Sequence, residues 1–245
     1  MVERRSVRSP PRGCLVGNVN RSRAPAVSEA STGSKASTGS KALTGSKAST
    51  GSKISTGSES SNVPVVVWLT GLPSSGKTTV GALVVHRLRA RSVPVLWLDS
   101  DDMRTVMTPS PTYSESERDQ FYRALGHIAI RAAEGGASVV VSATASRRAY
   151  RDNVRACVPR FVEVWLTCAT GTLRDRDPKG LYRKAEAHAI STLPGEGAPY
   201  EAPRLAELTV ATDACSAEEV ADRVMRHLEY LGVTGDDGCD EVRCP

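Results

Sequence analysis

The chain alternates between short, almost wholly apolar segments and longer segments in which apolar residues recur at the spacing of a helix. Five apolar segments are predicted to be strands: residues 64–70, 93–98, 137–143, 161–167 and 208–212. Strands without alternating polar residues are typical of a sheet that is covered on both faces. Together with the intervening helices they predict an α/β fold, with three layers around a parallel five-stranded sheet.

Four segments share the helical pattern: residues 77–91, 115–134, 147–158 and 216–231. Gly135 and Gly136 end the second segment, because glycine readily adopts the backbone conformation that stops a helix. Ser216 begins the last segment, and Glu219 follows three positions later, which is the spacing of a capping box.

A glycine-rich loop connects the first strand to the first helix and fits the P-loop pattern G-x-x-x-x-G-K-[ST]. Its glycines let backbone N–H groups turn toward a phosphate, and the N-terminus of the following helix attracts the same anion. Lys77 can reach the β- and γ-phosphates of ATP, and the Thr78 hydroxyl can bind Mg²⁺. The predicted ATP-binding residues of the loop are Gly71, Leu72, Pro73, Ser74, Ser75, Gly76, Lys77, Thr78 and Thr79.

Two carboxylates, Asp99 and Asp101, follow the second predicted strand. Ligands of parallel α/β sheets bind at the carboxyl ends of the strands, so we expect both side chains to face the glycine-rich loop. A carboxylate beside the γ-phosphate can help to bind Mg²⁺ or can position and deprotonate an attacking hydroxyl. The predicted catalytic residues are Lys77, Asp99 and Asp101, and the predicted metal ligands are Thr78 and Asp99. The alternative is that Ser100 or Asp101 only caps a following helix.

The connection after the fourth strand is polar and about 35 residues long, more than an ordinary loop needs. In a phosphotransferase, a mobile basic segment can close over the phosphates and exclude water, which limits hydrolysis of ATP. We therefore expect a lid at about residues 174–203. The alternative is a charged helix that is simply exposed to solvent.

Residues 65–229 resemble the adenylylsulfate kinase (APS kinase) family of P-loop kinases. The most specific shared strings are Arg-Asp-Pro-Lys-Gly-Leu-Tyr-Arg-Lys-Ala at 176–185 and Pro-Tyr-Glu-Ala-Pro at 199–203. Members of this family transfer the γ-phosphate of ATP to the 3′-hydroxyl of adenosine 5′-phosphosulfate and form 3′-phosphoadenosine 5′-phosphosulfate. The resemblance thus implies an ATP- and Mg²⁺-dependent enzyme of sulfate assimilation with a small-molecule acceptor. Family members are commonly homodimers.

The resemblance also implies roles for residues outside the glycine-rich loop. Asp99 would be the base or the organiser of the metal, and Arg176 would complete the ATP site. The residues implied as acceptor contacts are Arg104, Tyr113, Arg118, Thr144 and Lys179.

Several positions on the acceptor side depart from the family's pattern. Ser100 stands where the family has glycine, and Phe121 stands where it has asparagine. Tyr113 and Leu193 replace two phenylalanines, and Ala145 replaces a serine. A site that loses stacking and hydrogen bonding to a base should bind that base less well. Two alternatives therefore stay open: the same chemistry on another small hydroxyl-bearing acceptor, and a non-catalytic nucleotide-binding module.

The charge of the chain is unevenly distributed. The net charge is +5, but residues 1–62 contain ten basic and three acidic residues, a net charge of +7, which leaves −2 for the remainder. Residues 1–62 also contain a Ser-Thr-Gly-Ser-Lys-Ala repeat, typical of a disordered extension. The alternative is a segment for targeting to an organelle or for binding anions, because residues 1–30 are rich in Arg and Ser. We expect a kinase domain at 63–231 and a flexible acidic tail at 232–245. Because the basic charge lies outside this domain, we expect no binding of nucleic acid.

The chain shows no signal for a membrane or for secretion. No apolar run approaches the roughly 18 residues of a membrane span, and the first twenty residues lack a continuous apolar segment. The six cysteines are scattered without a C-x-x-C pair. We therefore expect a cytoplasmic protein that does not bind membranes.

Overall fold

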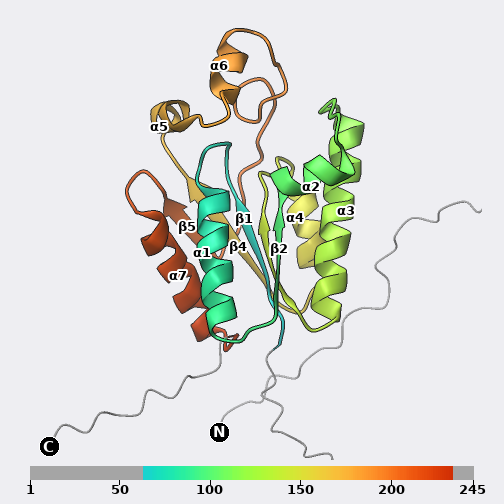
Figure 1. Ribbon diagram of the computed structural model, residues 1–245, viewed down its shortest axis with the longest axis vertical. Helices are drawn as coiled ribbons and strands as arrows, with labels where there is room; N and C mark the ends of the chain where they lie inside the picture. Colours follow the sequence, from blue (N-terminus) through green and yellow to red (C-terminus); the bar gives the residue numbers. More distant parts are fainter. Residues whose placement is uncertain (1–62, 234–245) are drawn as a thin grey trace, which may run out of the picture. The chain divides into compact units, whose positions relative to one another are not determined.

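Five parallel strands form the centre of the fold, in the order β2-β3-β1-β4-β5 across the sheet (Figure 1). The computed structural model describes residues 63–233. The strands are β1 (Val66–Thr70), β2 (Val95–Asp99), β3 (Ser138–Ser142), β4 (Phe161–Thr167) and β5 (Leu208–Ala211). The parallel five-stranded sheet predicted from the apolar segments is confirmed. The predictions for residues 1–62 and for the tail beyond residue 233 lie outside the described residues.

Seven helices accompany these strands within the described part of the chain. They are α1 (Lys77–Ala90), α2 (Ser100–Met107), α3 (Glu115–Glu134), α4 (Arg148–Arg155), α5 (Thr170–Arg176), α6 (Leu181–Glu186) and α7 (Ala217–Tyr230). The four predicted helices correspond to α1, α3, α4 and α7. Helices α2, α5 and α6 are not among the predicted elements. They are short and bury at most one residue each, so no apolar period marks them.

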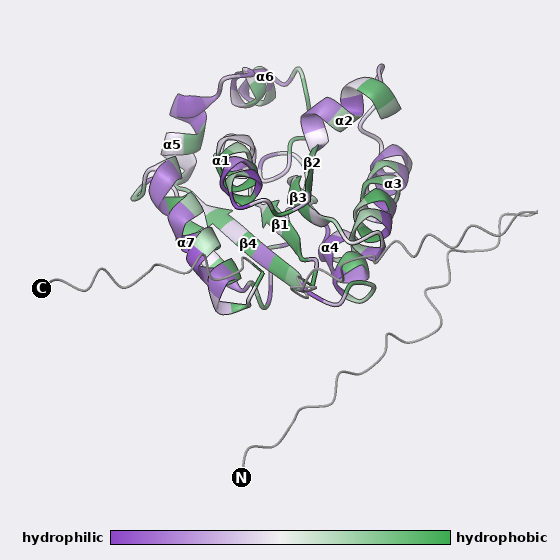
Figure 2. Ribbon diagram, turned by 60° about the horizontal axis from the view of Figure 1, so that its bottom comes forward, coloured by the Kyte–Doolittle hydropathy of each residue, from purple (hydrophilic) through white to green (hydrophobic). Residues whose placement is uncertain are grey.

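The sheet is covered on both faces, which explains why its strands are apolar. Val67 and Leu69 of β1 belong to a core on one face, together with residues of α1 and α7. Val66 and Trp68 belong to a second core on the opposite face, beneath α3 and α4. The two cores arise because successive side chains of a strand point to opposite faces. Figure 2 shows the apolar strands β1 and β3 between the helical layers.

The carboxyl ends of the strands meet at one edge of the sheet. Asp99 in β2 and Leu69 in β1 both pair with Ser142 in β3. The glycine-rich loop, α2 and the segment after β3 therefore start side by side, although they are far apart in the sequence. This edge is where parallel α/β sheets bind ligands.

The segment after β4 forms a cover beyond this edge and contains α5 and α6 (Figure 1). It has a small apolar core of its own, in which Leu173, Tyr182 and Leu193 are buried. Leu72 of the glycine-rich loop packs against this core. The segment predicted as a lid is therefore not a solvent-exposed helix alone, because it packs on the loop.

No helix within residues 63–233 combines the length and the apolar character that crossing a membrane requires.

Candidate active site

The glycine-rich loop begins where β1 ends, and its path depends on glycine at position 71. Gly71 has a φ of +152°, and a Cβ there would lie 2.4 Å from the carbonyl oxygen of Leu166 in β4. Gly76 has a φ of +88° and directly precedes α1, which begins at Lys77 as the pattern predicts. The unpaired N–H groups at the start of α1 are therefore available to an anion in the loop.

Lys77 folds back over the loop that precedes it. Its Nζ donates hydrogen bonds to the carbonyl oxygens of Gly71 at 3.0 Å and Leu72 at 2.7 Å. The residue keeps some exposed surface, but its ammonium group lies inside the loop, and this burial lowers the pKa of Lys77 to about 8. The carboxylates of Asp101 and Asp99 act against this shift and raise the pKa. Lys77 is thus mainly a cation at neutral pH and lies near two carboxylates.

Asp99 lies at the tip of β2 and uses both of its carboxylate oxygens. Oδ2 accepts a 2.7 Å hydrogen bond from the Thr78 hydroxyl, and Oδ1 accepts a 2.8 Å hydrogen bond from the Asp101 N–H. The second contact caps α2, so the capping residue is Asp99 and not Ser100 or Asp101, the two considered from the sequence. Asp99 is 4% exposed. The expected proximity of Asp99 to the loop is present, and the same carboxylate also supports α2.

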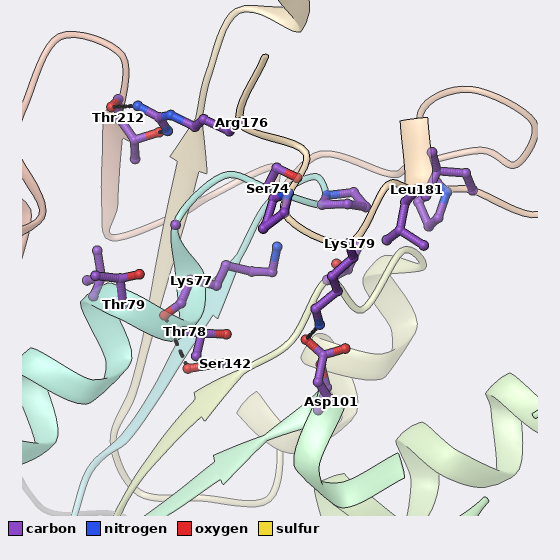
Figure 3. Close-up of a pocket in the computed structure, with 18 of the residues that line it drawn as sticks. Ser74, Lys77, Thr78, Thr79, Asp101, Ser142, Arg176, Lys179, Leu181 and Thr212 are labelled. Carbon is purple, nitrogen blue, oxygen red and sulfur yellow. Dashed lines mark hydrogen bonds and ion pairs between the residues drawn. The ribbon is translucent and has the colours of Figure 1, made fainter. Parts of the chain in front are cut away.

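The segment predicted as a lid contacts this edge of the sheet through Lys179. Its ammonium group forms an ion pair with Asp101, and both side chains line the main cavity (Figure 3). Lys179 lies on the turn between α5 and α6, where the buried carboxylate of Asp177 accepts hydrogen bonds from the N–H groups of Leu181 at 2.7 Å and Arg183 at 3.2 Å. Sequence reasoning missed Asp177, although an aspartate ahead of a helix start is a recognisable signal.

Arg176 ties the segment predicted as a lid to the loop after β5. Its guanidinium donates hydrogen bonds to the Thr212 hydroxyl at 3.1 Å and to the Thr212 carbonyl oxygen at 2.7 Å (Figure 3). Thr212, Cys215 and Ser216 line the same cavity and are not among the predicted site residues. Their position just after the fifth strand was the signal, because the rule that selected Asp99 applies equally to β5.

A cavity of about 720 Å³ extends from the glycine-rich loop to the lid. Six cationic side chains line it: Lys77, Arg104, Arg118, Arg176, Lys179 and Lys184. Asp101 is the one carboxylate among its lining residues. This excess of positive charge suits a polyphosphate together with a second anionic ligand.

Most of the predicted site residues meet at this cavity. The ATP-site residues that line it are Pro73, Ser74, Gly76, Lys77, Thr78, Thr79 and Arg176. The five residues implied as acceptor contacts line it as well: Arg104, Tyr113, Arg118, Thr144 and Lys179. The predicted site residues that do not line it are Gly71, Leu72, Ser75 and Asp99.

The positions that depart from the family's pattern have different surroundings. Phe121 is 2% exposed and does not line the cavity; its ring centroid lies 3.9 Å from the guanidinium carbon of Arg104. Ala145 is also buried, and its N–H donates a 3.1 Å hydrogen bond to the Tyr122 hydroxyl. Leu193 lines the cavity and belongs to the small core of the lid.

Oxygen atoms that could bind a metal ion meet at Thr78 and Asp99. Within residues 63–233, no group of three His, Cys, Asp or Glu side chains could hold a metal on its own. Mg²⁺ typically takes one or two protein oxygens and completes its shell with substrate phosphates and water. The hydroxyl and carboxylate of this pair therefore fit Mg²⁺ bound together with ATP.

Comparisons with known proteins point to one family. The family model described as adenylylsulphate kinase matches residues 63–211. The adenylyl-sulfate kinase of Rippkaea orientalis is 37% identical over 168 residues, which cover 69% of this chain and 93% of that protein. A bifunctional SAT/APS kinase of Sorangium cellulosum is 41% identical over 167 residues, which cover 68% of this chain but 29% of that longer protein.

A solved structure gives the same result. The APS kinase CysC of Mycobacterium tuberculosis, in complex with AMPPNP and APS, matches with a TM-score of 0.63 and 33% sequence identity. The match covers 68% of this chain and 98% of that one.

Proposed function

We propose a function for this protein from its family: the chain belongs to the adenylylsulphate kinase family, whose model matches residues 63–211. The protein transfers the γ-phosphate of ATP to the 3′-hydroxyl of adenosine 5′-phosphosulfate. The bond between the γ-phosphorus and its bridging oxygen breaks, a bond to the 3′-oxygen forms, and the hydroxyl proton is released. The products are ADP and 3′-phosphoadenosine 5′-phosphosulfate.

One observation carries the assignment of the reacting centre. The Thr78 hydroxyl and the Asp99 carboxylate are joined by a hydrogen bond of 2.7 Å, so the phosphate loop and the tip of β2 converge on one point. Asp101 faces the cavity next to this point and is paired with Lys179 of the lid. A γ-phosphate held by the loop would therefore lie between a cation of the lid and the carboxylates of β2 and α2.

On the ATP side, we assign binding of the β- and γ-phosphates to the N–H groups of the loop and to Lys77. The low pKa of Lys77 reflects a desolvated ammonium group, and a desolvated charge attracts phosphate oxygens more strongly than one in water. Arg176 is held by Thr212 at the end of the cavity near α7, and we assign this end to the nucleoside of ATP.

On the acceptor side, we assign different roles to the two carboxylates. Asp99, with Thr78, would hold Mg²⁺, which when bound supplies positive charge to the phosphate oxygens. Asp101 would orient the 3′-hydroxyl and accept its proton. Because the transition state of phosphoryl transfer is loose, position matters more than the strength of this base.

The lid would separate the reacting groups from water. It is attached to the acceptor side by a 2.5 Å hydrogen bond from Arg118 to the Thr192 carbonyl oxygen, and to the ATP side by Arg176. With both attachments in place, Lys179 lies over the cavity next to Asp101. Exclusion of water favours transfer to the acceptor over hydrolysis of ATP.

The test is a direct assay of the purified chain with Mg-ATP and adenosine 5′-phosphosulfate. Release of ADP that depends on the acceptor, together with the 3′-phosphorylated product on chromatography, is the expected result. ADP release with other hydroxyl compounds but not with adenosine 5′-phosphosulfate would overturn the acceptor assignment. Lys77→Ala is the control, and unchanged activity in this variant would overturn the assignment of the phosphate loop.

We also propose Mg²⁺ as the metal and a homodimer in the cytoplasm. The oxygen pair of Thr78 and Asp99 supports Mg²⁺, and activity that EDTA abolishes and Mg²⁺ restores is the expected result.

The family resemblance supports the homodimer, for which sedimentation of the full chain should give twice the 26.1 kDa of one chain. The use of ATP supports the cytoplasm, which fractionation of expressing cells would test.

A further inference from the structure

We propose that Phe121 is a specificity-determining residue that acts through Arg104, so that the acceptor is selected mainly by its anionic group and only weakly by its base. The substrate class that follows is the nucleoside 5′-phosphosulfates as a group. This inference rests on the proposed function, and it deepens the acceptor side of the same site.

Arg104 is held on several sides before any ligand arrives. Its guanidinium carbon lies 3.9 Å from the ring centroid of Phe121 and 5.1 Å from that of Tyr113. Its Nη1 lies 3.4 Å from Glu117 Oε1, and the Arg104 side chain is 12% exposed. A cation over an aromatic face is attracted to it, most strongly where water is excluded. Arg104 nevertheless lines the cavity, so it presents a fixed positive charge to a ligand.

The other members of this arrangement are also fixed. Glu117 accepts hydrogen bonds of 2.6 Å from both the N–H and the hydroxyl of Thr112, and the hydroxyl contact is the main cause that lowers the pKa of Glu117. The carboxylate therefore stays charged beside Arg104. Tyr113 has a φ of +54°, a conformation that an aromatic residue rarely adopts, and its carbonyl oxygen accepts a 3.0 Å hydrogen bond from Arg118.

Tyr113 thus lies near two guanidinium groups, with Arg104 at 5.1 Å and Arg118 at 5.7 Å from its ring centroid. Tyr113 lines the cavity and is 42% exposed, so its ring can stack on any nucleobase. Stacking discriminates poorly between bases, because every base has a π-face. The anion, in contrast, meets charges whose positions are already fixed, which lowers the entropic cost of binding.

The lining of the cavity lacks the side chains that pair with an adenine edge through a donor and an acceptor at once. None of its residues is Asn, Gln or His, and six of them are cations. Phe121 is covered by the Arg104 guanidinium and can neither donate nor accept a hydrogen bond. A site that hydrogen-bonds a substrate strongly rejects analogues that lack the matching group, and a site without such bonds does not.

The first experiment measures steady-state kinetics with adenosine 5′-phosphosulfate and ATP for Phe121→Leu and Phe121→Tyr. Loss of the aromatic face in Phe121→Leu should raise the KM for the acceptor about tenfold, with the KM for ATP and kcat within about twofold of the parent. Phe121→Tyr keeps the ring and should behave as the parent. A merely structural role would instead change kcat and both KM values together with the melting temperature.

Phe161→Leu is the matched control. Its ring lies under Arg155 at 4.6 Å in the same type of contact, but Arg155 does not line the cavity, whereas Arg104 does. Its acceptor KM should not change. Phe121→Leu should also have no further effect in an Arg104→Ala background, because Phe121 acts through Arg104. Additive effects of the two substitutions, or an unchanged acceptor KM in Phe121→Leu, would overturn the proposal.

The second experiment compares two altered acceptors with adenosine 5′-phosphosulfate. Guanosine 5′-phosphosulfate keeps the anion and changes the base, and its kcat/KM should lie within about tenfold of the parent substrate. Adenosine keeps the base and lacks the anion, and its kcat/KM should fall by at least about 100-fold. A higher kcat/KM for adenosine than for guanosine 5′-phosphosulfate would overturn the proposal. A wild-type chain that forms no product from adenosine 5′-phosphosulfate would instead refute the proposed function itself.

Discussion

The Thr78 hydroxyl donates a 2.7 Å hydrogen bond to Asp99 Oδ2, and this contact links α1 to the tip of β2. In the sheet, β3 lies between β2 and β1, the strand that precedes α1. The two residues are 21 positions apart in the chain. Asp99 is buried and also accepts the N–H of Asp101, so its carboxylate is fixed at both oxygens. The pair therefore forms a preorganised oxygen site.

Asp99→Asn should lower kcat by about 100- to 1000-fold, because an amide replaces the charged oxygen at this site. The amide oxygen can still cap α2, so the free energy of unfolding should change by less than about 1 kcal/mol. Steady-state assays and urea denaturation measure the two effects. Asp102→Asn, on the same helix with an exposed side chain, should keep full activity. An Asp99→Asn enzyme with half of the parent activity would contradict the assigned role.

Gly71→Ala should reduce stability by about 2–4 kcal/mol and greatly weaken ATP binding. The reason is the 2.4 Å approach of a Cβ to the Leu166 carbonyl oxygen, together with the φ of +152°. Chemical denaturation and nucleotide titration measure these effects. Gly171→Ala is the control, because nothing lies within 4 Å of its added Cβ. This helical position should gain up to about 1 kcal/mol, and equal losses at both positions would exclude the steric explanation.

ATP binding should take up a proton at alkaline pH. In the free protein burial lowers the pKa of Lys77 from 10.5 to about 8, so the amine is mostly neutral at pH 9. Bound phosphates favour the charged form and raise this pKa again, so binding should take up about 0.9 proton at pH 9 and about 0.1 at pH 7. Calorimetry in two buffers of different ionisation enthalpy measures the uptake. Lys77→Arg stays charged and should remove it, and equal uptake in that variant would show that another group is responsible.

Lys179→Ala should lower kcat about 10- to 100-fold and raise the share of ATP that is hydrolysed without transfer. Lys179 connects the lid to Asp101, and without it the cavity is less completely closed to water. The ratio of ADP to 3′-phosphorylated product measures the leak. Arg183→Ala is the control, because its side chain is 78% exposed and does not line the cavity. A ratio that stays constant in Lys179→Ala would argue against a closing role.

Arg151→Ala should destabilise the fold by about 3–5 kcal/mol, because it leaves the buried carboxylate of Glu163 without its main partner. Arg151 Nε lies 2.5 Å from Glu163 Oε1, and the two side chains are 1% and 5% exposed. The same guanidinium binds the carbonyl oxygens of Ala145 and Glu201, so it joins the acceptor side to the end of the lid.

The exposed ion pair of Arg91 and Glu229, at 2.8 Å, provides the comparison for this stability measurement. Arg91→Ala should change the free energy of unfolding by less than about 1 kcal/mol, because solvent screens the pair. Urea denaturation of both variants tests the difference. Similar losses in the two variants would mean that burial does not determine the contribution of the pair.

The phosphate loop was predictable because all of its residues are contiguous. The spacing from Gly71 to Thr78 reflects a local backbone requirement, and the apolar strand before it and the helix after it are equally local. The fold class followed in the same way from the alternation of apolar strands with helices. The segment predicted as a lid stood out in the sequence because of its length, its charge and its strings shared with one family.

Short elements and contacts between distant segments were not predictable. Helix α2 has no buried residue, so no apolar period marks it. Thr212 had a local signal, its place after the fifth strand, but its hydrogen bond with Arg176 joins segments 36 residues apart and was not predictable. The sequence shows that position 121 holds a side chain without a hydrogen-bonding group. It does not show that the Phe121 ring contacts Arg104, because the two residues lie on different helices.

The sequence by itself therefore determined what depends on near neighbours in the chain: the parallel α/β fold, the phosphate loop and the family. The tertiary structure alone decided which carboxylate caps α2, which residues close the cavity, and how Arg104 is held. Those features depend on distances between segments that the fold brings together, and no periodicity along a single chain encodes such distances.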